Sequence, residues 1–195
     1  MKKIFILIIT IVFLSCSKEP EKNTKEMPGD ATHKMAMDGE KLATATGNIL
    51  QFADIKLTTP VNWIEEPTTS DMRIIQYFLK EDKTINIVGF YFGNQPNMVA
   101  ENIQRWKDEF SKVDISDEAK LAKGKATMVS ITGTYRKKPF PMAQDFEEVP
   151  GYTTLASIVE TNKGPFYFKM VGPSKIIKAE TDHFKSFLDS YQEAK

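Results

Sequence analysis

The apolar and polar positions of the chain divide it into three parts. Residues 4–14 form an almost unbroken apolar run. Residues 16–47 are mostly polar, contain no aromatic side chain and show no period. From about residue 48 onward, apolar residues recur with the periods that are typical of strands and helices. We therefore expect one folded domain at residues 48–195, preceded by a polar segment.

The pattern in this domain predicts six strands and two hairpins. Charged residues at 81–83 separate two β-rich runs, and the sequence TNKG at 161–164 is typical of a tight turn. Phe166, Phe168 and Met170 alternate along one run, so we expect them to share a face. Residues 127–135 alternate in the manner of a half-buried strand. The expected strands are residues 55–57, 72–79, 85–92, 127–135, 152–160 and 165–171.

Two further segments have the spacing of amphipathic helices. The first follows Asn97, a suitable N-cap, and its apolar stripe consists of Val99, Ile103, Trp106 and Phe110. The second follows Ser174, which can cap it, and its stripe consists of Ile177, Phe184, Phe187, Leu188 and Tyr191. The resulting order, β-β-β-α-β-β-β-α, predicts an α+β domain with a mostly antiparallel sheet and helices packed on it.

The apolar run at the start of the chain has the features of an export signal. Lys2 and Lys3 precede it, and its length is below the ~20 residues that span a bilayer. Leu14-Ser15-Cys16 ends the run and resembles the bacterial lipobox, although Phe13 stands where that motif prefers leucine. The resemblance implies a signal peptide at residues 1–15 and lipid attachment to Cys16. An uncleaved anchor, or an ordinary signal with a chance cysteine, is the alternative.

A lipid on Cys16 gives the rest of the polar segment a role. Cys16 is the only cysteine of the chain, so it has no disulfide partner within it. Two or more acyl chains anchor a protein stably, and a diacylglycerol meets that condition. We therefore expect residues 16–47 to be a flexible tether and the protein to be held at a membrane of the bacterial envelope. Ser17 follows the cysteine in place of an inner-membrane aspartate signal, which favours the outer membrane if one is present.

The charge balance excludes one class of partner. The chain has 26 basic and 26 acidic residues. Non-specific binding of nucleic acid requires a basic excess, so we expect no nucleic-acid partner.

Four short motifs in the domain carry a family resemblance. They are Thr59-Pro60-x-x-Trp63, Asn102-Ile103-x-Arg105-Trp106, Gly133-Thr134-Tyr135 and Phe168-Lys169-x-x-Gly172-Pro173. Together they resemble uncharacterised bacterial envelope proteins with the PsbP-like fold of the extrinsic photosystem II proteins. The resemblance implies an antiparallel sheet between helical layers, and a non-enzymatic binding or assembly role. It implies no functional residue, because fold and function are separable.

The residue types of the domain offer little for catalysis. Of the two histidines, His33 lies in the tether and His183 on the last expected helix. Asp145, Glu147 and Glu148 cluster in a loop, where such residues are usually solvated. Neither a nucleophile elbow, nor a phosphate-binding glycine motif, nor zinc-ligand spacing is present. We expect no enzyme, no cofactor and no metal site, with a hydrolase that uses His183 or a carboxylate pair as a weaker alternative.

The tether offers a second alternative to a binding role, namely metal handling. Met27, His33, Met35 and Met37 lie close together. Thioether and imidazole groups suit soft ions such as Cu(I), so copper handling by this segment is an open hypothesis.

The longest expected loop, from Arg136 to Gly151, is the best candidate for a contact site. It begins basic, ends acidic and carries Phe140, Met142 and Phe146. Loops of this length are often functional. Two interpretations stay open: a lid that folds onto the sheet, or a surface that contacts an envelope protein partner or a ligand. Trp63, Trp106 and Arg105 are candidates to line a cleft, although the spacing of Trp106 is also that of a core residue.

Overall fold

A seven-stranded sheet forms the centre of the domain within residues 47–68, 70–96, 98–140 and 142–194, which the computed structural model describes. Its strand order is β3-β4-β5-β9-β8-β7-β6, and every neighbouring pair is antiparallel. The strands are β3 (Trp63–Glu65), β4 (Arg73–Leu79), β5 (Asn86–Tyr91), β6 (Phe110–Leu121), β7 (Ala126–Lys137), β8 (Glu147–Val159) and β9 (Phe166–Pro173). The expected α+β class with a mostly antiparallel sheet is confirmed.

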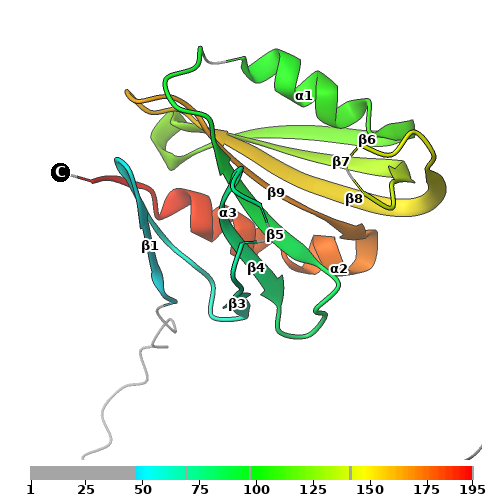
Figure 1. The fold of residues 1–195 in the computed structure, drawn as a ribbon, viewed down its shortest axis with the longest axis horizontal. Coiled ribbons are helices and arrows are strands. Elements are labelled where there is room, and N and C mark those ends of the chain that lie inside the picture. The colour runs from blue at the N-terminus through cyan, green and yellow to red at the C-terminus, as the bar shows by residue number, and fades with distance from the viewer. Residues whose placement is uncertain (1–46, 69, 97, 141, 195) are drawn as a thin grey trace, which may run out of the picture. The chain divides into compact units, whose positions relative to one another are not determined.

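A smaller sheet and the helices complete the domain. The small sheet has the order β1-β2-β10, with β1 (Ile49–Phe52), β2 (Ile55–Thr58) and β10 (Gln192–Glu193). The helices are α1 (Val99–Lys107), α2 (Ser174–Ala179) and α3 (Thr181–Asp189), and a 3-10 turn, η1, spans Ala122–Gly124. Helix α1 lies on one side of the large sheet, and α2 and α3 lie on the other (Figure 1).

Each side of the large sheet has its own apolar core. On the α2 and α3 side, Phe166, Phe168 and Met170 of β9 pack with Ile177, Phe184 and Phe187 of the helices and with Ile55 and Leu57 of β2. On the α1 side, Ile103 and Trp106 pack on Val129 and Ile158. The central strands are therefore buried on both faces, because both faces are covered.

The patterns with the strongest apolar signal are confirmed. Strands β4 and β5 pair as a hairpin, and so do β8 and β9 around residues 161–164. Phe166, Phe168 and Met170 share a face, as expected. Ile177, Phe184, Phe187 and Leu188 are fully buried, although they belong to two short helices rather than one.

Strand β6 was not predicted. It lies at the edge of the large sheet, and nearly all its residues are exposed. It is rich in Lys, Asp and Glu, which protect an edge from pairing with other chains but remove the apolar alternation that marks a strand. Strands β1, β3 and β10 were not predicted either. They have two to four residues each, which is too few to show a clear period.

Four local expectations are wrong. Ser174 does not cap α2; its hydroxyl bonds Thr153 Oγ1 at 2.8 Å instead. Phe110 joins the α1 core, but as the first residue of β6 rather than as part of the helix. The half-burial expected for residues 127–135 is wrong at residues 127 and 128, because Met128 is buried in the opposite core; from Val129 to residue 134, buried and half-buried residues alternate as expected. Tyr191 lies beyond the end of α3.

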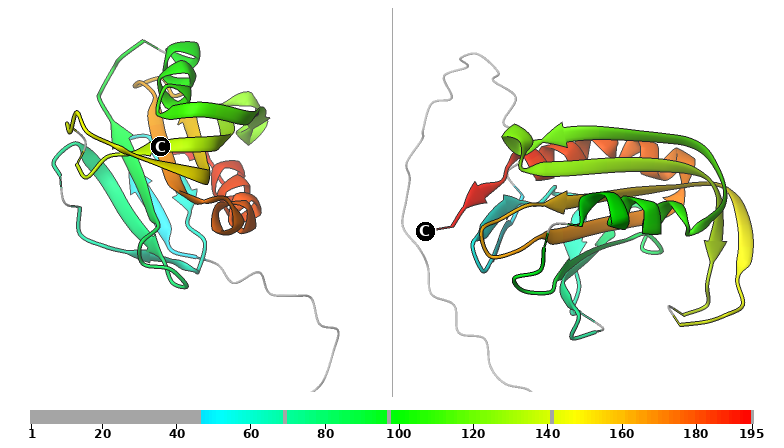
Figure 2. Two further views of the ribbon diagram at one scale, coloured as in Figure 1. Left: turned by 90° about the vertical axis from the view of Figure 1, so that its right-hand side faces the viewer. Right: turned by 90° about the horizontal axis from the view of Figure 1, so that it is seen from above.

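The expected loop 136–151 is in fact partly a strand pair. Arg136 and Lys137 of β7 pair with Glu148 and Glu147 of β8, which leaves only residues 138–146 as the connection. We call residues 134–151 the arm. The two strands bend away from the sheet at the base of the arm (Figure 2). There Gly151 has a φ of +71°, and a Cβ on Gly133 would lie 1.9 Å from the Lys112 carbonyl oxygen.

Several expectations concern residues outside the described part of the chain. They are the signal peptide at 1–15, the lipid site Cys16, the tether up to residue 46 with Met27, His33, Met35 and Met37, and the N-cap Asn97. The structure places Met98 at the N-cap position of α1, without a side-chain hydrogen bond.

Candidate binding cleft on the α1 side of the sheet

A cleft of about 960 Å³ lies between α1, strands β4, β5 and β9, and the arm. Its volume is within the range of small-molecule and peptide sites. Apolar side chains from α1, β5, β9 and the arm line it: Val88, Phe90, Trp106, Phe140, Phe146 and Val171. A ligand in the cleft would therefore contact both the sheet and the arm.

The cleft is basic although the chain as a whole is neutral. Six basic side chains line it: Arg73, Arg105, Arg136, Lys137, Lys138 and Lys169. Only two acidic side chains do so, Asp108 and Glu109, whereas the whole chain has 26 residues of each sign. Concentrated charge of one sign in a concave surface raises the local concentration of ligands of the opposite sign. The cleft therefore favours an anionic ligand.

The inner wall of the cleft is a network around Glu109. Its carboxylate forms an ion pair with Lys169, so the charge of Lys169 is already balanced. Tyr135 donates a hydrogen bond to the same carboxylate, and burial together with the charge of Glu109 raises the pKa of its phenol. The Tyr135 ring also packs against Phe110 and Tyr152, at centroid distances of 5.3 and 6.0 Å. This wall is preorganised and structural.

Arg136 attaches the base of the arm to the end of α1. Its Nη1 donates to the Asp108 carbonyl oxygen at 3.0 Å, and its backbone N–H donates to the Glu109 carbonyl oxygen at 2.8 Å. Its guanidinium lies 5.5 Å from the Phe146 ring centroid, a cation–π arrangement. Its Nε is buried and has no partner among the described residues. Arg136 thus fixes the base of the arm to the end of α1.

The outer rim of the cleft is exposed. Phe140 retains 60% of its surface and Phe146 45%, and Met142 beside them retains 83%. Lys137 and Lys138 are exposed, and neither forms an ion pair within the described part of the chain. The arm is therefore not a closed lid, because the rings expected to fold onto the sheet border an open cleft.

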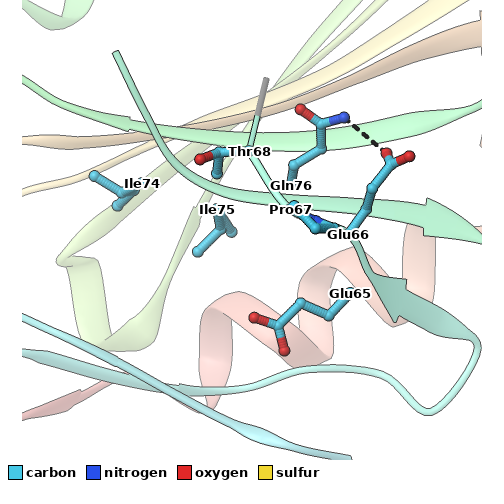
Figure 3. Close-up of a pocket in the computed structure, with 7 residues that line it drawn as sticks. All are labelled: Glu65, Glu66, Pro67, Thr68, Ile74, Ile75 and Gln76. Carbon is cyan, nitrogen blue, oxygen red and sulfur yellow. Dashed lines mark hydrogen bonds between the residues drawn. The ribbon is translucent and has the colours of Figure 1, made fainter. Parts of the chain in front are cut away.

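A second, smaller hollow of about 400 Å³ lies beside β3 and β4 (Figure 3). The Glu66 carboxylate accepts a 2.7 Å hydrogen bond from Gln76 Nε2, while Glu65 points to the opposite side of the strand. Burial and the charge of Glu65 raise the pKa of Tyr77 to about 12. Because the two carboxylates point apart, this hollow does not provide the acid pair that hydrolysis needs.

His183, the expected base of a hydrolase, lies in a structural cluster. Its Nδ1 is 3.2 Å from Glu180 Oε2. The same carboxylate accepts hydrogen bonds from Trp63 Nε1 at 3.1 Å and from Asn62 Nδ2 at 2.9 Å. Glu180 is the only hydrogen-bond partner of the His183 side chain among the described residues, so no hydroxyl group is held next to the imidazole for activation.

Of the other site residues predicted from the sequence, some line the cleft and others do not. Trp106 and Arg105 do line the cleft, with Trp106 buried at its floor. Trp63 instead belongs to the opposite core. Asp145, Glu147 and Glu148 are exposed and line neither hollow.

Two features are absent from the described residues. They contain no group of three or more His, Cys, Asp or Glu side chains that could hold a metal ion. None of their helices is long and apolar enough to cross a membrane.

Comparison with known proteins adds one structural likeness. No family model matches the chain, and no curated protein matches it. Among solved structures, the chain is similar to the solution structure of cyanobacterial PsbP (CyanoP) from Synechocystis sp. PCC 6803, with 8% identity and a TM-score of 0.48. The match covers 80% of this chain and 97% of that one.

Proposed function

We propose that this protein is a lipoprotein, anchored through Cys16, whose domain binds a partner in the bacterial envelope without catalysing a reaction. The binding site is the cleft between α1, the sheet and the arm. The observation that carries the proposal is the lining of this cleft, where six basic side chains and several apolar ones surround a single concave surface.

The composition of the cleft fits recognition. Exposed aromatic rings next to arginine are the side chains that contribute most to binding interfaces. Phe140 and Phe146 are available at the rim, and the Arg136 guanidinium is held beside Phe146. The half-buried titratable groups of the inner wall, by contrast, are engaged with one another: Glu109 binds Lys169 and Tyr135. A partner therefore gains contacts at the rim without disrupting the inner wall.

The site proposal is tested with a photo-crosslinking amino acid in living cells. It is placed at Phe140 in one variant and, as a matched control, at Phe52, which is 37% exposed on β1. We expect a discrete crosslinked product from position 140, identified by mass spectrometry after purification from membranes, and none from position 52. The same products from both positions, or none from position 140, would contradict a binding site at the arm.

The anchor is tested separately. Cells expressing the full chain are labelled with an alkyne fatty acid, and the Cys16→Ala variant is the control. We expect label on the wild-type chain and none on the variant, because the thiol is the attachment point. Label that persists in the variant, or an unlabelled wild-type chain, would contradict lipid attachment at Cys16.

A further inference from the structure

We propose that the tip of the arm, formed by Phe140, Met142 and Phe146, inserts into the surface of the membrane that carries the lipid anchor. This inference rests on the proposed function, because the lipid on Cys16 is what holds the domain near a bilayer. It adds an orientation to that function. The cleft beside the arm is then held at the membrane surface, so its partner meets the domain there.

Large apolar side chains are exposed together at the tip of the arm. Met142 is the most exposed large apolar side chain of the described residues, with 83% of its surface in contact with solvent, and Phe140 and Phe146 beside it are also exposed. The two rings border the cleft, but Met142 does not line it. Filling the cleft would therefore not by itself cover Met142. Apolar surface gathered on one projecting element indicates a contact with another molecule or with a membrane.

The size of the tip favours a bilayer over a protein as this contact. The arm projects from the end of the large sheet (Figure 2). A large apolar side chain buries about 200 Å², so the three partly exposed ones offer roughly 300–400 Å² together. A specific protein interface takes about 800 Å² from each partner. A bilayer needs no matching surface, since binding to it scales with whatever apolar area is inserted.

The charges beside the tip suit a zwitterionic lipid surface. Basic residues precede the tip and acidic ones follow on the returning side of the arm, all of them exposed: Lys137, Lys138, Asp145, Glu147 and Glu148. An anionic surface would attract the lysines but repel the carboxylates. The phosphate and amine groups of a zwitterionic headgroup instead offer both signs. The attraction therefore comes from the apolar side chains and not from net charge.

The tether is long enough to let the arm reach the membrane. Between Cys16 and Gly47 the chain has about 30 residues, which span at most about 100 Å. A folded domain of this length is only about 40 Å across. An anchor at Cys16 therefore does not dictate which side of the domain faces the bilayer. It also raises the effective concentration of lipid around the arm, so the insertion of three side chains need not be strong on its own.

The test uses the full chain, acylated on Cys16 and reconstituted into phosphatidylcholine vesicles. An environment-sensitive fluorophore with a thiol-reactive group is attached to the Met142→Cys variant. The wild-type chain should not take this label, because its only thiol carries the lipid. The matched control is Ile115→Cys, at a side chain that is 52% exposed on β6. Emission is compared between vesicles with and without lipids that carry a nitroxide near the headgroup end of the acyl chain.

We expect the nitroxide to quench the label at position 142 at least about twofold and the label at position 115 less than about 1.2-fold, because only the tip enters the lipid. Adding Phe140→Ser/Phe146→Ser to the Met142→Cys chain should reduce the quenching to that of the control. High salt should leave the quenching at position 142 unchanged, because screening acts on charges and not on apolar contacts.

Three results would overturn the inference. The first is equal quenching at positions 142 and 115. The second is quenching at position 142 that persists after both rings are replaced. The third is quenching that requires anionic lipid and disappears at high salt, since the arm would then be attracted by charge.

Failure of this inference is distinguishable from failure of the proposed function. A wild-type chain that takes the thiol label has no lipid on Cys16, which contradicts the proposed anchor and this inference together. An acylated chain that shows no quenching at position 142, but still crosslinks to a discrete partner from position 140, keeps the anchor and the cleft. Only the insertion of the arm is then wrong.

Discussion

Replacing Glu180 tests whether the His183 cluster is structural. The Glu180 side chain is only 10% exposed, and its carboxylate accepts hydrogen bonds from Trp63 Nε1 and Asn62 Nδ2 in addition to its contact with His183. Hydrogen bonds to a charged group contribute about 1.5–3 kcal/mol each, and a buried donor left without a partner costs a similar amount. Trp63 is 3% exposed, so water cannot readily replace the lost acceptor. We therefore expect Glu180→Ala to lower the free energy of unfolding by roughly 3–5 kcal/mol.

The measurement is urea unfolding followed by tryptophan fluorescence, with two matched variants. Glu180→Gln retains one carbonyl oxygen and should lose roughly 1–3 kcal/mol, since one of the two donors keeps its acceptor. Asp182→Ala removes a carboxylate that is 95% exposed and 3.9 Å from Lys185, and should change stability by less than about 1 kcal/mol. If Glu180→Ala costs no more than Asp182→Ala, the cluster does not hold α3 to the β2–β3 connection, and the structural interpretation of His183 fails.

Three further variants test other parts of the fold. Gly133→Ala should lower stability by more than about 2 kcal/mol in urea unfolding, because its Cβ would meet the Lys112 carbonyl oxygen at 1.9 Å; a neutral effect would show that the arm can shift freely. Phe168→Ala should cost roughly 3–5 kcal/mol by the same assay, since Phe168 is fully buried and packs edge-on against Phe187; a loss below about 1 kcal/mol would contradict the packing. The Tyr77 pKa is raised to about 12 in the folded chain, so its contribution is complete below about pH 10 and is lost as the pH rises toward 12. Tyr77→Phe should therefore reduce the loss of stability between pH 10 and 12, and an unchanged pH profile would show that Tyr77 ionises freely.

The fold was predictable wherever burial leaves a period in the sequence. The β8–β9 hairpin combines a turn at 161–164 with long apolar runs, and the helical stripe of Ile177, Phe184 and Phe187 has a regular spacing. Strand β6 was unpredictable for the opposite reason. Phe110 is its only buried residue, and Ala119 and Leu121 are half-buried. The strand is held by backbone pairing with β7, and such pairing leaves no apolar period in the sequence.

The candidate site was only partly predictable. Phe140, Phe146 and the basic residues 136–138 stand out locally, as does the neighbouring pair Arg105 and Trp106. The contributions of Arg73 and Lys169 were not foreseeable, because each is a lone charge within a strand pattern and lines the cleft only through long-range pairing of β4, β5 and β9. A cleft formed by residues that lie far apart in sequence depends on topology, which period and composition do not specify.

The position of the arm illustrates how backbone geometry creates the site. Gly133 and Gly151 have no chemical group to offer a ligand, yet both lie where β7 and β8 leave the sheet. A straight continuation of the two strands would have kept Phe140 and Lys138 in line with the sheet instead of bordering the cleft. The bend brings the basic strand of the arm to the end of α1, where Arg136 binds the Asp108 carbonyl oxygen. The charge of the cleft is therefore a consequence of two glycines as much as of its lysines, and a variant that straightens the arm should lose binding even with every basic residue retained.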